Sequence, residues 1–219
     1  MKIFGQEYRL TTPLSEKDVQ GLCAGDIVYI SGDIWGGRQA VLKQIVENHE
    51  RPPINTQEMN VFYTGGEGMV PADKEHSCWE PLPTGILLGR RFEKWYPGLI
   101  RETGLRAIIA KGTTGASTRA ACMEYGCVQL TSFGWNVTPH FTDVLTEKIK
   151  DVEVYWREAG MIESLVVYHV ENSGPWLVNI DTMGDDLFDR INSGLDKKLN
   201  DIYSRIGISK DFKPDTWLE

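Results

Sequence analysis

The chain has 219 residues, of which 41% are hydrophobic and 25% are charged, and its 23 Lys and Arg against 31 Asp and Glu give a net charge of −8. This length fits one ordinary domain with a core of normal size. An acidic balance argues against nucleic-acid binding, although a few local Arg and Lys residues can still form a pocket for a small anion.

The elements expected from apolar periodicity and turn residues are short strands that alternate with helices. Taken in chain order, strands are predicted at 26–31, 61–63, 105–110, 127–131, 152–156, 164–171 and 176–181, and helices at 37–48, 92–102, 117–125, 141–149 and 185–205. The turn residues at 172–175 predict a hairpin between the last two strands. The segment 63–83, rich in Gly and Pro, predicts a long loop, and such loops are often functional.

This alternation predicts an α/β fold with a mixed sheet and flanking helices. We expect a single domain over residues 1–219, with a core at about 10–188 and a C-terminal helix and tail at 185–219.

No apolar run reaches the roughly 18 residues needed to span a bilayer, and the N-terminus lacks the apolar core of a signal peptide. We therefore expect a cytoplasmic protein that is not bound to membranes. The cysteines, which form no Cys-x-x-Cys pair, are Cys23, Cys78, Cys122 and Cys127. Since the four histidines are also scattered, we expect buried thiols and no metal ligand from this chain.

Three segments carry residues suited to binding an anion, and the first two lie at predicted strand ends. At the first, Gly37 and Arg38 open a helix, where backbone N–H groups and a guanidinium both favour a carboxylate. The alternative is a plain turn with a solvated Arg. At the second, Lys111 follows a strand, and open α/β sheets bind ligands at the carboxyl ends of their strands. The Gly-x-x-x-x-Gly-Lys-Ser/Thr phosphate loop is absent.

The third segment follows the long loop, where Arg90 and Arg91 open a predicted helix. A solvated basic patch is the alternative to an anion site there.

Several segments, in this order, resemble the β subunit, or C-terminal domain, of the class I fumarase and L(+)-tartrate dehydratase family. They are Ala24 to Gly32, Gly37-Arg38, Gly104 to Gly112, Val152 to Val154, Gly160 to Glu163, and Val170 to Asp181. The similarity extends from about Leu10 to Phe188, so it covers most of the chain.

The resemblance implies a swivelling β/β/α domain, docked on an α subunit that holds an iron–sulfur cluster with its own cysteines. This chain is then expected to bind no cluster itself and to be inactive without that partner. A homodimer of the β part is a further expectation.

The implied activity is that of a hydro-lyase acting on a small hydroxy acid or unsaturated carboxylate. By resemblance, Arg38, Gly37, Arg90 and Arg91 bind the carboxylates, Lys111 stabilises developing negative charge, and Thr84 transfers the proton.

The chain departs from the family pattern at two sites. Gln39 and Leu42 stand where the family has Asp and His, and the Thr motif around Thr84 is altered in spacing. A Leu in place of His removes a group that can exchange protons near neutral pH. The sequence therefore leaves two alternatives open: a non-catalytic paralogue that binds anions or assembles with other chains, and a stand-alone lyase or isomerase without a cluster.

Overall fold

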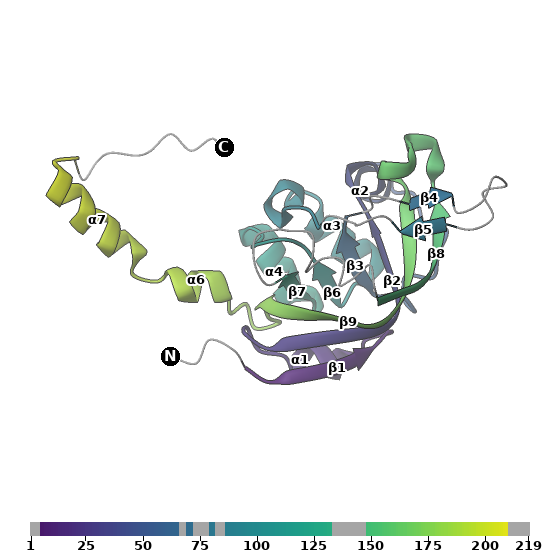
Figure 1. The fold of residues 1–219 in the computed structure, drawn as a ribbon, viewed down its shortest axis with the longest axis horizontal. Helices are drawn as coiled ribbons and strands as arrows, with labels where there is room; N and C mark the ends of the chain where they lie inside the picture. Colours follow the sequence, from purple (N-terminus) through teal and green to yellow (C-terminus); the bar gives the residue numbers. More distant parts are fainter. Residues whose placement is uncertain (1–4, 66–68, 72–78, 82–85, 133–147, 210–219) are drawn as a thin grey trace. The chain divides into compact units, whose positions relative to one another are not determined.

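A computed structural model describes residues 5–65, 69–71, 79–81, 86–132 and 148–209 (Figure 1). The chain divides into two compact units, Met1–Leu187 and Phe188–Glu219. The strands are β1 (Glu7–Thr11), β2 (Ile27–Gly37), β3 (Val61–Thr64), β4 (Met69–Pro71), β5 (Trp79–Pro81), β6 (Ala107–Ile109), β7 (Val128–Ser132), β8 (Ile149–Tyr155) and β9 (Leu165–Ile180). The helices are α1 (Glu16–Gln20), α2 (Gln39–Val46), η1 (Gly89–Phe92), α3 (Tyr96–Thr103), α4 (Ala116–Tyr125), η3 (Arg157–Ala159), η4 (Met161–Glu163), α6 (Leu187–Asn192) and α7 (Leu195–Ile206).

The main sheet closes on itself. Its order is β1-β2-β3-β6-β7-β9-β8, and β9 also pairs with β2, so β2, β3, β6, β7 and β9 form a ring of paired strands. The pairs β2–β3, β3–β6 and β6–β7 are parallel, whereas β9 runs antiparallel to β2, β7 and β8. The predicted α/β class with a mixed sheet and flanking helices is confirmed.

Side chains that alternate along the strands divide into two hydrophobic clusters. One cluster fills the inside of the ring with residues such as Tyr63, Ile109 and Trp176. The other lies between the outer face and helices α2, α3 and α4, and contains Phe62 and Ile108. Consecutive residues of β3 and β6 therefore face opposite sides and are buried on both, which is typical of parallel strands covered by helices.

The predicted hairpin at 172–175 is wrong, because residues 165–180 form one strand. β2 pairs with both halves of β9, from Gly36↔Val166 to Ile27↔Leu177, with register shifts where Asn172 and Gly174 adopt positive φ. These residues therefore produce an irregularity within a continuing strand and no reversal of the chain.

Two predicted helices are shorter than expected. The helix predicted at 92–102 begins only at Tyr96, because Pro97 is favoured in the first turn of a helix. The helix predicted at 185–205 is broken into α6 and α7 around Gly194, whose φ is 89°. The predicted loop 63–83 contains the antiparallel pair β4–β5, and the helix predicted at 141–149 lies almost entirely outside the described residues.

In the described part of the second unit, α7 carries exposed apolar side chains that recur at helical spacing; they are Leu195, Leu199, Ile202 and Ile206. In the described part of the chain, no helix is both long and apolar enough to cross a membrane.

Candidate functional site at the carboxyl ends of the parallel strands

Strands β2, β3 and β6 end at the same edge of the sheet. Gly37 pairs with Thr64, and Tyr63 pairs with Ile109, so Arg38 and Lys111 follow at this edge with only β3 between their strands. Two strand spacings separate their backbones by about 10 Å. The two predicted strand ends that carry Arg38 and Lys111 are thus brought together.

The segment that carries Arg90 and Arg91 also lies at this edge. Leu87 N donates to Thr64 O at 2.9 Å, Lys111 N donates to Leu87 O at 2.9 Å, and Gly89 N donates to Lys111 O at 3.0 Å. These bonds place η1, with its exposed Arg90 and Arg91, beside Lys111. All three predicted cationic segments therefore meet here, whereas Thr84 lies outside the described residues.

Arg38 is held by a carboxylate of its own chain. It is the N-cap of α2, and its Nε lies 3.4 Å from Glu163 Oε1. Glu163 Oε2 accepts from Ala40 N at 2.9 Å. A carboxylate of the chain itself, that of Glu163, therefore binds at Arg38 and the start of α2, and the predicted binding of a substrate carboxylate there stays a prediction.

Glu93 binds backbone N–H groups at the start of α4, as Glu163 does at the start of α2. It accepts from Gly115 N and Thr118 N and from the hydroxyls of Ser117 and Thr118. Burial acts to raise the pKa of Glu93, but these hydrogen bonds outweigh it and lower the pKa below its usual value. Helices α2 and α4, which follow β2 and β6, therefore each have a glutamate from another segment at their N-terminus.

Lys111 has a different environment. Among the described residues, no acidic side chain forms an ion pair with Lys111, and its side chain is partly buried. Gly112, the next residue, is bound by neutral groups, because Gly112 N donates to Thr131 Oγ1 at 3.0 Å and Gln129 Nε2 donates to Gly112 O at 3.1 Å. Lys111 therefore presents a positive charge that no described side chain neutralises.

The structure shows the environment of Gln39 and Leu42, the two residues of α2 that depart from the family pattern. Leu42 is fully buried among the side chains of the outer cluster, so this position contributes packing in this chain. Gln39 is the first residue of α2, next to Arg38.

Two of the three cysteines in the described part do not suit a cluster, whereas Cys23 is exposed, so the prediction of a buried thiol is wrong for Cys23. Cys122 and Cys127 are buried in the core, and burial raises the pKa of the Cys127 thiol well above its usual value. Cluster ligands are thiolates, so these two thiols do not fit. Within the described residues, no group of three or more His, Cys, Asp or Glu side chains can hold a metal ion.

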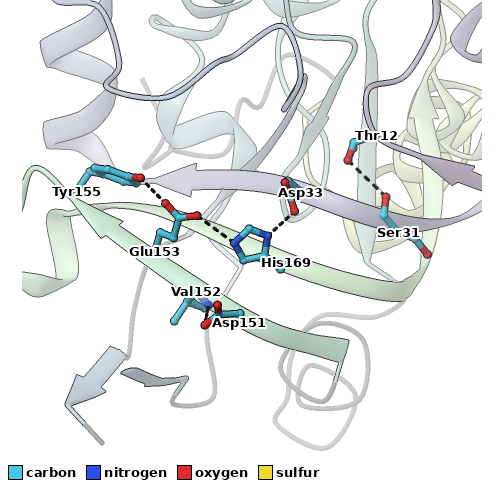
Figure 2. Close-up of polar contacts among 8 residues, drawn as sticks. All are labelled: Thr12, Ser31, Asp33, Asp151, Val152, Glu153, Tyr155 and His169. Atoms are coloured by element: carbon cyan, nitrogen blue, oxygen red, sulfur yellow. Dashed lines mark hydrogen bonds and ion pairs between the residues drawn. The ribbon is translucent and has the colours of Figure 1, made fainter. Parts of the chain in front are cut away.

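A second polar cluster crosses β2, β9 and β8, away from the strand ends (Figure 2). The His169 ring lies between Asp33, which bonds to Nδ1, and Glu153, whose Oε1 is 3.2 Å from Nε2; Tyr155 donates to Glu153. Burial lowers the pKa of His169, but the bonds and charges of the two carboxylates outweigh it and raise the pKa. This arrangement favours a charged imidazolium that joins three strands.

A surface depression of about 460 Å³ lies at the opposite edge of the sheet, lined by Gln57, Arg101, Arg106 and neighbouring residues. Arg106 donates from Nη1 to Tyr125 O at 2.8 Å and to Gly126 O at 3.1 Å. Arg106 thus provides hydrogen-bond donors for the free carbonyl groups at the C-terminus of α4, and this role is structural.

Sequence reasoning missed four residues at the strand ends: Glu93, Gln129, Glu163 and Asn179. Glu163 lies in a segment that carries the family resemblance, but its contact with Arg38 joins residues 125 positions apart. No local pattern marks the other three, because each acts on a segment remote from it in the sequence.

The comparisons with known proteins agree with the resemblance. The sequence profile of the family described as "Fumarase C-terminus" matches residues 5–191. The L(+)-tartrate dehydratase subunit beta of Escherichia coli (strain K12) is 29% identical over 180 residues, which is 81% of this chain and 85% of that protein. A Methanocaldococcus jannaschii protein named for the same subunit is 29% identical over 194 residues, 86% of this chain and 95% of that protein.

A longer protein of Geobacillus stearothermophilus, named for class I fumarate hydratase, is 27% identical over 191 residues, which is 87% of this chain but 35% of that protein.

Proposed function

Because this chain belongs to the fumarase C-terminus family, we propose that it is the β-type subunit of an iron–sulfur-dependent hydro-lyase. Its substrate is a small hydroxy acid or unsaturated carboxylate, to which water is added or from which it is removed next to a carboxylate. The names of the relatives support this reaction class. A swivelling β/β/α fold, a single functional domain over residues 1–219, and a cytoplasmic location belong to the same proposal.

The observation that carries the proposal is the positive charge at the ends of β2, β3 and β6. Lys111 is not neutralised by any described side chain, and Arg90 and Arg91 are exposed beside it. An anion bound here meets several donors at once, and a fixed ammonium stabilises negative charge that develops during the reaction. In the proposal, the Lys111 ammonium stabilises the negative charge that develops on the substrate, and Arg90 and Arg91 bind the carboxylates of the substrate.

Arg38 and Gly37 complete the carboxylate site in this proposal, with Glu163 as the internal partner of Arg38. Thr84 keeps its proposed role in proton transfer by resemblance alone, since it lies outside the described residues. The iron–sulfur cluster is assigned to an α subunit by the family resemblance, and the burial of Cys122 and Cys127 supports this assignment.

One observation favours the alternative, a non-catalytic module that binds anions or assembles with other chains. Arg38 is expected to bind a carboxylate of the substrate. In this chain the carboxylate of Glu163 already makes that contact with Arg38 and also accepts from Ala40 N. Lys111 nevertheless retains an uncompensated charge among the described residues, and we therefore prefer the hydro-lyase.

The proposal is tested by expressing the chain under anaerobic conditions together with the cysteine-rich proteins encoded beside it, and by purifying the complex through this chain. Iron and acid-labile sulfide are measured, and tartrate, malate and other hydroxy acids are assayed for dehydration by ultraviolet absorbance. A complex that contains iron and sulfide and dehydrates a hydroxy acid is expected. A chain that purifies alone, without iron or turnover, contradicts the proposal.

A further inference from the structure

A pair of buried amides lies directly behind the Lys111 loop. Gln129 is on β7 and Asn179 on β9, and both side chains have no exposed surface. Their strands pair with each other, with Gln129 opposite Ile180. Burying two amides is unfavourable unless hydrogen bonds within the protein replace those that the amides make with water. The hydrogen bonds that Gln129 and Asn179 make therefore indicate the role of the pair.

The hydrogen bonds fix the orientation of both amides. Gln129 Nε2 faces three carbonyls, those of Ala110 at 3.1 Å, Gly112 at 3.1 Å and Leu130 at 3.0 Å, so this atom must be the donating nitrogen. Its oxygen then faces Asn179, whose Nδ2 donates to it at 2.7 Å. Neither amide can be reversed without placing two acceptors against each other.

These amides hold the loop on both sides of Lys111. Gln129 Nε2 donates to the carbonyl oxygens of Ala110, the residue before Lys111, and of Gly112, the residue after it. Gly112 has a φ of 70°, a conformation that glycine adopts readily, and its N–H is bound by Thr131. The backbone that carries Lys111 is thus fixed at each neighbouring peptide.

The same network continues to Thr113. Asn179 Nδ2 also donates to Thr113 Oγ1 at 3.1 Å, and Thr113 Oγ1 donates to Asp186 Oδ2 at 3.2 Å. Asn179 Oδ1 is buried and meets no hydrogen-bond partner among the described residues. An unsatisfied buried acceptor is destabilising, but the Nδ2 of the same side chain satisfies Gln129 Oε1 and Thr113 Oγ1. Asn179 therefore links the Gln129 amide to the loop at the cost of one unsatisfied acceptor.

We propose that Gln129 and Asn179 are positioning residues that hold the 110–113 backbone so that the Lys111 ammonium meets the anionic substrate. This inference rests on the proposed function. A neutral support fixes the cation without neutralising it, whereas a carboxylate in the same place would lower the positive potential that binds the substrate.

The test compares Gln129→Met and Asn179→Leu with Asn60→Leu in the assembled complex. Asn60 is a matched control, since it is a buried amide that binds Leu14 N and Leu14 O, both at 2.8 Å, before the first residue of β3 at the opposite edge. For each variant we measure kcat and KM, and the exchange rate of amide hydrogens in residues 107–115 by mass spectrometry. Each substitution is also made in a Lys111→Met background.

We expect Gln129→Met and Asn179→Leu to lower kcat/KM by about tenfold to a hundredfold and to accelerate exchange in residues 107–115. In the Lys111→Met background, the effect of each on kcat/KM is expected to shrink to about twofold, because the residues act through Lys111. Asn60→Leu is expected to leave kcat/KM and this exchange unchanged.

Unchanged exchange in Gln129→Met overturns the inference, whatever the activity does. It is also overturned if the loss of activity persists in full without the Lys111 amine, or if Asn60→Leu causes the same loss. Should neither amide variant fold, Thr131→Val, which removes the acceptor for Gly112 N, is measured in the same way. A wild-type complex without turnover refutes the proposed function, and the exchange data then still decide whether the amides hold the loop.

Discussion

Two cations stand at the carboxyl ends of strands in the same sheet, and the chain supports them in opposite ways. Arg38, after β2, is bound by the carboxylate of Glu163. The loop of Lys111, after β6, is bound by the neutral amide of Gln129. A carboxylate orients a cation but neutralises it, whereas an amide bound to the backbone orients the cation and leaves its charge for a ligand. The comparison predicts that Lys111 contributes more to anion binding than Arg38.

The largest effect is expected for Lys111→Met in the assembled complex. Removing the amine takes away a charge that faces the developing negative charge of the substrate, so kcat/KM should fall by about a hundredfold to a thousandfold, or about 3 to 4 kcal/mol. Steady-state kinetics measure it. Lys150→Met is the control, because Lys150 lies on β8 in an exposed ion pair with Glu171. Equal losses in the two variants would refute the role of Lys111.

A smaller effect is expected for Arg38→Ala, about tenfold in kcat/KM, because part of the charge of Arg38 already interacts with Glu163. Glu163→Gln sharpens the comparison, since Gln can still accept from Ala40 N while the charge on Arg38 is released. We expect KM for the anionic substrate to fall in Glu163→Gln. A rise in KM would mean that Glu163 positions Arg38 and does not compete with the substrate.

Glu93→Gln tests the second carboxylate at a helix N-terminus. The amide keeps only one accepting oxygen, so the variant should lose about 1 to 3 kcal/mol of unfolding free energy, measured by urea denaturation. Because the folded pKa of Glu93 is lowered, its contribution to stability is present above the unfolded pKa and is lost as the pH falls through the folded pKa. Glu102→Gln, on the more exposed end of α3, is expected to have little effect.

The smallest effect is a pH dependence from His169. Its folded pKa is raised, so its stabilising contribution is fully present below the unfolded pKa of about 6.5 and is lost as the pH rises through the folded pKa. The cluster is partly exposed, so the change in unfolding free energy should stay below about 1 kcal/mol. His169→Gln should abolish this pH dependence, whereas His49→Asn, at an exposed histidine, should retain it.

The sequence predicted the part of the fold that local patterns encode. The strands at β3 and β7 and the helices α2 and α4 were expected within about two residues of their observed bounds, because apolar spacing and glycines mark them. The closure of the sheet by β9 was not expected, since Asn172 to Pro175 read as a turn. That segment continues as a strand because β2 offers a pairing partner on both sides of it, and such a partner is a property of the tertiary structure.

The same distinction applies to the candidate site. Lys111, Arg38, Arg90 and Arg91 were predicted because strand ends, helix starts and a family resemblance point to them, and the roles of these residues stay predictions. Glu163 and Asn179 were not predicted, because their hydrogen bonds reach Ala40 and Gln129 across 123 and 50 positions of the chain. Spacing within one element contains no information on such partners.

The 16 residues of β9 link the two polar regions of this protein, with His169 near one end and Asn179 near the other. Successive side chains of a strand point to opposite faces, so a deletion or insertion of one residue after Ser173 would exchange the faces of everything beyond it. A deletion of one residue would place Asn179 in the position of Val178, on the apolar inside of the ring. Between His169 and Asn179, an insertion or deletion of two residues should therefore destabilise the protein far less than an insertion or deletion of one residue.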